Sequence, residues 1–161
     1  MMDNKIECFF SDVAERDMDF LFLEEFVCSQ EFLNIFTSLV GINNAKVKSV
    51  YLSLRDASLG ESDITVIVES NGEIIGLLIE NKIDAVAMPD QAIRYNKRGQ
   101  KGIKNGDYSR FYVFIIAPSK YLIHNVEAQK YPNKVEYEKI LSYFVNNQDR
   151  PLFFFPLALA N

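Results

Sequence analysis

Two runs of apolar residues lie on either side of an Asn-Gly pair near the middle of the chain. Asn71-Gly72 predicts a β-hairpin, because both residues tolerate the positive φ of a two-residue type I′ turn. With this turn, Ser70 lies opposite Glu73. The same register brings aliphatic side chains of both strands onto one side, which we expect to face the core: Ile64 opposite Ile79, Val66 opposite Leu77, and Val68 opposite Ile75.

Patterns elsewhere in the chain predict an α/β fold. Residues 17–40 repeat apolar side chains at helical spacing, and Ser29 is placed to cap a second helix. Pro89 is placed to open a further helix, since its fixed φ suits a first turn. Residues 99–109, which hold three glycines, predict a flexible loop. The remaining predicted elements are a strand over residues 46–54, a buried strand over 110–117 that completes a βαβ unit, and a helix over 135–145.

The hairpin register also brings together polar side chains. Asp63 lies directly opposite Glu80, on the face away from the aliphatic side, and Lys82 shares that face because side chains alternate along a strand. Two carboxylates roughly 5 Å apart repel each other unless a positive charge lies between them. Such oxygen ligands suit Mg²⁺, which takes one or two carboxylates and completes its shell with water and substrate phosphate. The sequence therefore predicts a magnesium site with an adjacent lysine.

These residues, Asp63 and then Glu80-Asn81-Lys82, resemble the motif of the PD-(D/E)XK nuclease superfamily. Gln91 and Tyr95 match the QxxxY element of its RecB-like branch. The stretch ERDMDFLFLEEF is similar to the first helix of the family, and FYVFIIAPSKYL and VEYEKIL are similar to later elements of uncharacterised prokaryotic members. The resemblance implies an α/β restriction-endonuclease-like core, in which a central mixed β-sheet is flanked by helices in αβββαβ order.

The resemblance implies a divalent-metal-dependent nuclease, a hydrolase of phosphodiester bonds with DNA as the expected substrate. Mg²⁺, with Mn²⁺ as a substitute, is expected to bind Asp63, Glu80 and the backbone carbonyl of Asn81. The first helix of the family usually adds a glutamate. Counting 100° per residue favours Glu25, at the edge of the apolar face, over Glu24 on the opposite side. The alternative that both glutamates are solvated stays open.

Lys82, Gln91 and Tyr95 complete the expected catalytic group. Lys82 positions the attacking hydroxide or stabilises the charge of the transition state. By the resemblance, Gln91 orients the metal site or binds a phosphate, and Tyr95 hydrogen-bonds the substrate backbone. Their four-residue spacing places both on one helical face. The alternative is an amphipathic crossover helix with incidental polar residues.

Charge is distributed unevenly along the chain. The formal net charge is −5, which is unusual for a protein that binds nucleic acid. Acidic residues dominate the first 31 positions, whereas basic residues gather directly after the proposed site. We expect this basic strip to contact phosphates, with an ordinary solvated surface as the alternative. Its members are Arg94, Lys97, Arg98, Lys101 and Lys104.

The length of 161 residues predicts a single domain over residues 1–161. No signal peptide is visible, and no apolar run approaches the roughly 20 residues of a membrane span. Cys8 and Cys28, without a CxxC motif, are expected to be reduced thiols of a cytoplasmic protein. The apolar residues 151–161 predict packing against this domain, against a second copy in a homodimer, or against a C-terminal continuation missing from this chain.

Several other chemistries lack support in the sequence. His124 is the only histidine, which argues against zinc chemistry and a His-based triad, and no GxxxxGK loop is present. Two alternatives to a nuclease stay open. One is a catalytically inactive nuclease-fold module for binding or oligomerisation, which the acidic surface and short chain favour. The other treats Asp63, Glu80 and Lys82 as a structural salt-bridge cluster in an oligomer interface.

Overall fold

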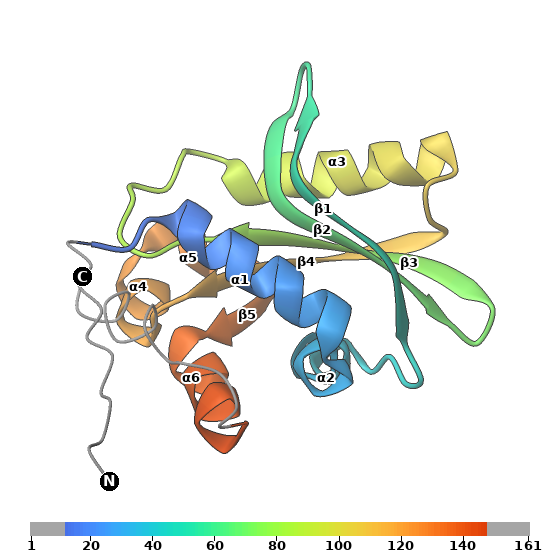
Figure 1. The fold of residues 1–161 in the computed structure, drawn as a ribbon. Coiled ribbons are helices and arrows are strands. Elements are labelled where there is room, and N and C mark those ends of the chain that lie inside the picture. Colours follow the sequence, from blue (N-terminus) through green and yellow to red (C-terminus); the bar gives the residue numbers. More distant parts are fainter. Residues whose placement is uncertain (1–11, 148–161) are drawn as a thin grey trace, which may run out of the picture.

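The predicted hairpin lies at the centre of the protein, whose computed structural model describes residues 12–147 (Figure 1). The two turn residues have φ values of 51° and 81°, and they connect β2 (Gly60–Ser70) to β3 (Glu73–Asn81). Positive φ at both positions is what a type I′ turn requires. The predicted register is confirmed: Ser70 pairs with Glu73, Val68 with Ile75, Val66 with Leu77, and Ile64 with Ile79.

Five strands form one open mixed sheet in the order β1-β2-β3-β4-β5. At one edge β1 (Lys46–Asp56) is antiparallel to β2. On the other side of the hairpin β4 (Arg110–Ala117) runs parallel to β3, and β5 (Asn133–Glu136) runs parallel to β4. The predicted βαβ unit is therefore present, with α3 (Gln91–Asn105) as its crossover helix.

Helices flank both faces of this sheet, so the fold is α/β (Figure 1). One face packs against α1 (Glu15–Cys28), α2 (Gln30–Thr37) and α6 (Tyr137–Asn146). The other face packs against α3 and the short helices α4 (Ser119–His124) and α5 (Val126–Gln129). A 3-10 turn, η1 (Ser38–Val40), follows α2. As predicted, Ser29 separates the first two helices and caps the second, since its hydroxyl accepts the Phe32 N–H at 3.1 Å.

The predicted flexible loop over residues 99–109 is wrong for residues 99–105, because α3 continues to Asn105 and only residues 106–109 form a turn. Gly99 and Gly102 within the helix serve close packing. A Cβ on Gly99 would lie 2.2 Å from the Phe111 ring, and one on Gly102 would lie 2.1 Å from the Tyr108 hydroxyl. The aromatic side chains that follow the helix fold back onto it, and only glycine leaves them room. The helix also begins at Gln91, two residues after Pro89.

Two expectations concern features beyond the sheet and its helices. No helix within residues 12–147 is long and apolar enough to cross a membrane. The apolar segment 151–161, on which the expected homodimer rests, lies outside the described residues.

Candidate active site

Asp63, Glu80 and Lys82 come together where β3 ends beside β2 and β4. Glu80 is almost completely buried, with 1% of its surface exposed. The Lys82 ammonium lies 2.8 Å from Glu80 Oε1. Asp63 accepts the backbone N–H of Asn81 through Oδ2 at 2.8 Å. The backbone pairing of β2 with β3 stops at Ile64 and Ile79, and beyond it the Asp63 side chain replaces the backbone as the partner of the Asn81 N–H.

The first turns of α3 bring Gln91 and Tyr95 onto the same carboxylate. The Gln91 side-chain amide donates to Glu80 Oε1 at 2.6 Å, and the Tyr95 hydroxyl donates to Glu80 Oε2 at 2.5 Å. The same hydroxyl accepts the backbone N–H of Asp63 at 3.1 Å. The predicted four-residue spacing therefore places both side chains on one side of the helix, where they fix the orientation of Glu80.

Burial and like charge shape the electrostatics of this group. Burial, together with the negative charge of Glu80, raises the pKa of Asp63 to about 8. Burial disfavours the charged form of Lys82, but the charges of Glu80, Glu15 and Asp63 outweigh it and raise the pKa of the ammonium. At neutral pH, in the absence of a divalent cation, the group thus holds a charged lysine and an Asp63 that retains its proton.

A second polar cluster lies on the opposite side of β3, around Asn81. Its amide nitrogen donates to Asp19 Oδ1 at 2.9 Å and to the Glu15 carbonyl at 3.0 Å, and its amide oxygen accepts the Tyr137 hydroxyl. Burial raises the pKa of Asp19 to about 6, despite the hydrogen bond from Asn81. Only the backbone carbonyl of Asn81 enters the sequence prediction, which missed this side-chain role.

The structure does not bring Glu25 into this site. Glu25 is buried near the other end of α1, where its Oε2 accepts the Tyr143 hydroxyl at 2.7 Å. Glu15 is instead the first-helix carboxylate beside the site: Oε1 accepts the Ile83 N–H at 3.0 Å, and Oε2 lies 3.4 Å from the Lys82 ammonium. The two glutamates are ten positions apart, which corresponds to about 15 Å of helix, so only the end that crosses β3 can reach Lys82.

The first-helix acids carried a signal that sequence analysis did not use. Asp19 lies three positions before Phe22, on the buried stripe of α1, and an acidic residue on such a stripe needs a polar partner. The helical pattern alone could not decide between Asp19 and Glu25, because both lie on that stripe.

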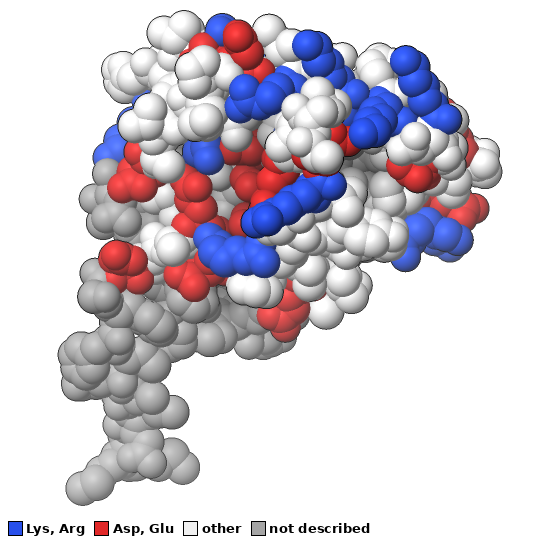
Figure 2. Space-filling model, turned by 90° about the horizontal axis from the view of Figure 1, so that it is seen from above, with Lys and Arg blue, Asp and Glu red and all other residues white. Residues whose placement is uncertain are grey.

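The predicted basic strip does not present five available charges. Arg94 donates to the Pro89 carbonyl at 2.6 Å, Arg98 is buried, and Lys101 pairs with Asp56. Lys97 and Lys104 are exposed. On the face shown in Figure 2, acidic side chains gather near the middle with lysine and arginine side chains beside them.

Strained backbone lies next to Asp63. Ser53 in β1 has a φ of 53°, and it falls between the pairs Leu52–Ile64 and Leu54–Ser62, opposite Asp63. Its hydroxyl accepts a hydrogen bond from Arg16 of α1. A left-handed serine inside a strand is unfavourable, and such strain clusters at functional sites. No pattern in the sequence marks this position.

The site can supply oxygen ligands, but it is not a ready cage. Within residues 12–147 no group of three or more histidine, cysteine or acidic side chains has the arrangement of a metal site. The carboxyl groups of Asp63 and Glu80 are close enough to interact electrostatically. Oδ2 of Asp63 accepts the Asn81 N–H, whereas Oδ1 accepts no hydrogen bond from a described residue. Two carboxylates suit Mg²⁺, which retains water and phosphate ligands. Comparison of the chain with models of known protein families, with curated proteins and with solved structures found no match.

Proposed function

We propose that this protein is a divalent-metal-dependent nuclease that hydrolyses phosphodiester bonds, with DNA as its substrate and with a restriction-endonuclease-like core of the PD-(D/E)XK type. One observation carries the proposal: Asp63, Glu80 and Lys82 converge at the end of β3, and Gln91 and Tyr95 hold Glu80 in place. The spacing that carries the family resemblance is thus also a spatial cluster.

The electrostatics of the cluster support a cation between the two carboxylates. Asp63 retains its proton to about pH 8 because it is buried beside the charge of Glu80. A divalent ion that replaces this proton would bind Asp63, Glu80 and the Asn81 carbonyl. When bound, Mg²⁺ supplies Lewis-acid polarisation of the phosphodiester and lowers the pKa of a coordinated water.

The remaining side chains have roles that follow from their contacts. Lys82 places a positive charge 2.8 Å from Glu80, where it can stabilise negative charge that develops on a phosphate or orient a water molecule. Gln91 donates to Oε1 of Glu80 and Tyr95 donates to Oε2, and together these hydrogen bonds fix the orientation of the carboxylate plane. The Asn81 side chain anchors the end of β3 to α1 and α6, so that the carboxylates keep their relative positions.

Substrate contact would fall mainly to exposed lysines. Lys97 and Lys104 lie on the exposed side of α3, the helix that carries Gln91 and Tyr95. Such lysines bind phosphates without regard to sequence. With Arg98 and Lys101 engaged internally, few positive charges are left to contact phosphates, so we expect substrate binding and cleavage to depend only weakly on salt.

One observation favours the alternative of an inactive module or a salt-bridge cluster. Both oxygens of Glu80 already accept hydrogen bonds, from Gln91 and Tyr95, and Lys82 pairs with it as well. A buried carboxylate with this many partners is satisfied without a metal. A bound cation would have to compete with at least one of these donors.

The decisive experiment is a cleavage assay with supercoiled plasmid and with single-stranded DNA, in Mg²⁺ or Mn²⁺ and in chelator. Asp63→Asn, Glu80→Gln and Lys82→Met keep side-chain size, and each should reduce cleavage by at least about 100-fold. Lys139→Met is the matched control. Because Lys139 is exposed on α6, this variant should cleave DNA like the wild type.

The outcomes separate the three readings. Equal cleavage by the wild type and the three site variants would contradict the proposed mechanism. Calorimetric Mg²⁺ binding that Asp63→Asn abolishes, without any cleavage by the wild type, would identify an inactive nuclease-fold module. If the wild type neither binds Mg²⁺ nor cleaves DNA, the remaining reading is a structural salt-bridge cluster.

A further inference from the structure

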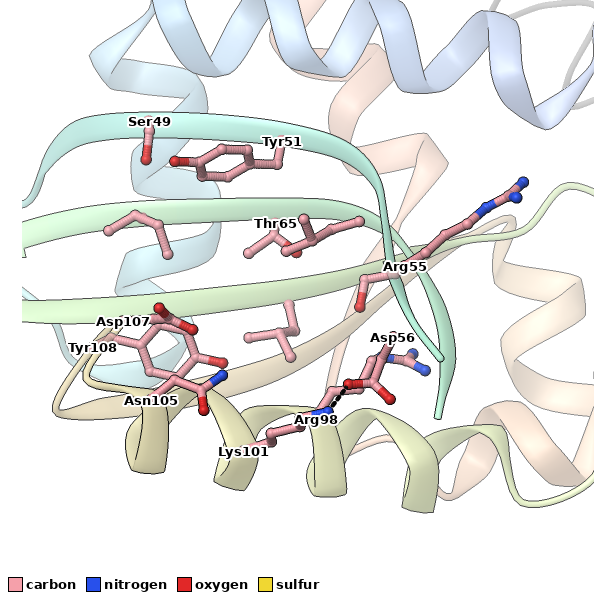
Figure 3. A pocket seen from close by; sticks show the side chains of 15 residues that line it. Ser49, Tyr51, Arg55, Asp56, Thr65, Arg98, Lys101, Asn105, Asp107 and Tyr108 are labelled. Atoms are coloured by element: carbon pink, nitrogen blue, oxygen red, sulfur yellow. Dashed lines mark hydrogen bonds and ion pairs between the residues drawn. The ribbon is translucent and has the colours of Figure 1, made fainter. Parts of the chain in front are cut away.

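A cavity of about 470 Å³ lies between the sheet and α3 (Figure 3). It is close to the candidate active site, because Arg98 in its wall stacks on the Tyr95 ring. Its walls come from β1, β2, β3, α3 and the turn that follows α3. Thr65 and Ile67 line it from β2, on the same strand face as Asp63, because side chains of alternate residues share a face. The volume falls in the range of about 300–1,000 Å³ that is typical of small-molecule pockets.

A buried arginine lines this cavity with donors that no described residue uses. Arg98 is only 8% exposed. Its Nη1 donates to the Leu59 carbonyl, and its guanidinium lies over the Tyr95 ring, 4.1 Å from the centroid. Its Nε and Nη2 are buried and have no hydrogen-bond partner among residues 12–147. Unpaired donors on a buried charge are unfavourable, and they indicate a place for an acceptor.

A second unpaired polar atom lies in the same wall. The Thr65 side chain is 4% exposed and also lines the cavity, and its hydroxyl has no partner within the described part of the chain. Thr65 pairs with Tyr51 of β1 and with Leu78 of β3, and both of these neighbours also line the cavity. Two independent buried polar groups therefore lack partners at one cavity.

The charges around the cavity leave Arg98 as its uncompensated cation. Lys101 pairs with Asp56, and Arg55 pairs with Glu61 at 2.7 Å. Asp107 also lines the cavity, but it is exposed. Arg98 forms no ion pair with any described residue.

We propose that this cavity binds a small molecule that carries an oxyanion, a carboxylate or a phosphate, on an apolar or aromatic body. Nε and Nη2 of Arg98 donate to two oxygens of the anion, the fork geometry for which guanidinium is suited. The Thr65 hydroxyl donates to one of these two oxygens in a carboxylate, or to a third oxygen in a phosphate. Ile67, Leu78 and the Tyr108 ring contact the apolar body. This inference does not rest on the nuclease proposal.

The test is calorimetric titration of the full chain, in chelator, with four probes: benzoate, adenosine monophosphate, inorganic phosphate and the neutral benzamide. We expect benzoate or adenosine monophosphate to bind at least about tenfold more tightly than benzamide. Stronger binding of the first indicates a carboxylate ligand, and stronger binding of the second indicates a phosphate ligand. Inorganic phosphate measures the contribution of the anion without a body.

Two variants and a control link binding to the cavity. Arg98→Lys keeps the positive charge but loses the paired donors of the guanidinium, so it should weaken binding about tenfold. Thr65→Val removes an unpaired hydroxyl, so the variant should fold and bind the anion about threefold more weakly. Lys139→Gln, on the opposite layer, should bind like the wild type. If Arg98→Lys does not fold, Thr65→Val decides. The proposal is overturned if no anion binds the wild type at millimolar concentration, if benzamide binds as tightly, or if the folded variants bind unchanged. None of these readouts involves cleavage or metal.

Discussion

Glu80 and Asn81 are consecutive residues of β3, yet they enter two different kinds of polar cluster. Asn81 faces α1 and α6, where its amide donates twice and accepts once. Glu80 faces α3, where it lies beside a lysine and a second carboxylate. The Asn81 side chain is neutral, and its amide forms three hydrogen bonds. Glu80, in contrast, is an acidic side chain that is buried beside a second carboxyl group and an ammonium group. The difference indicates that the first cluster holds the strand and the second is suited to chemistry.

Removal of the Asn81 side chain should give the largest change in stability. Asn81→Ala removes the hydrogen bond that the buried Asp19 carboxylate accepts from the amide and the one that the Tyr137 hydroxyl donates to it. We expect the free energy of unfolding in urea to fall by about 2–4 kcal/mol. Asn96→Ala, at an exposed position of α3, should change it by less than about 0.5 kcal/mol. A loss below about 1 kcal/mol for Asn81→Ala would show that the amide cluster does not anchor the strand.

The carboxylate cluster should instead reveal itself through pH. In chelator, folded Asp63 keeps its proton up to about pH 8, whereas the unfolded carboxyl loses it near 3.8. The folded state therefore binds more protons between these values, so stability is lost as pH rises. Near pH 6–7 this single group makes the free energy of unfolding fall by up to about 1.4 kcal/mol per pH unit.

Asp63→Asn isolates that contribution, since the amide oxygen can still accept the Asn81 N–H. The variant should lose the Asp63 share of the slope in urea unfolding measured from pH 6 to 7. Asp84→Asn, at an exposed position, should retain the slope of the wild type. Identical slopes for the wild type and Asp63→Asn would mean that the two carboxylates are not crowded.

The smallest effects come from removing one hydroxyl on each side of the strand. Tyr95→Phe and Tyr137→Phe each delete a donor to a β3 side chain, and each should cost about 1 kcal/mol of stability. Only Tyr95→Phe should also slow DNA cleavage, by about tenfold, because Tyr95 orients Glu80. Equal cleavage by the two variants would remove the functional distinction between the clusters.

The sequence predicted those parts of the site that depend on local geometry. The Asn-Gly turn determined the hairpin register as far as Ile64 and Ile79, and Asp63 and Glu80 lie directly beyond these paired residues and interact electrostatically. The four-residue spacing of Gln91 and Tyr95 put both on one helical side. These conclusions needed only the period of a strand and of a helix.

The parts that were missed depend on contacts distant in sequence. The choice between Glu15 and Glu25 depends on which end of α1 crosses β3, which no periodicity within the helix reveals. Residues 99–105 read as a loop because glycine is rare inside helices, but Tyr108 and Phe111 fold back onto Gly102 and Gly99. Tertiary packing outweighed local propensity there.

The stacking of Arg98 on Tyr95 has a consequence for both sites. Tyr95 contacts Glu80 through its hydroxyl and Arg98 through its ring, so one side chain separates the cavity from the carboxylates. An anion that binds Arg98 also changes the field that Tyr95 experiences. By thermodynamic linkage, if an anion at Arg98 changes the affinity of the carboxylates for a cation, the cation changes the affinity of the cavity for the anion by the same factor. Titration with both ligands together would measure this coupling.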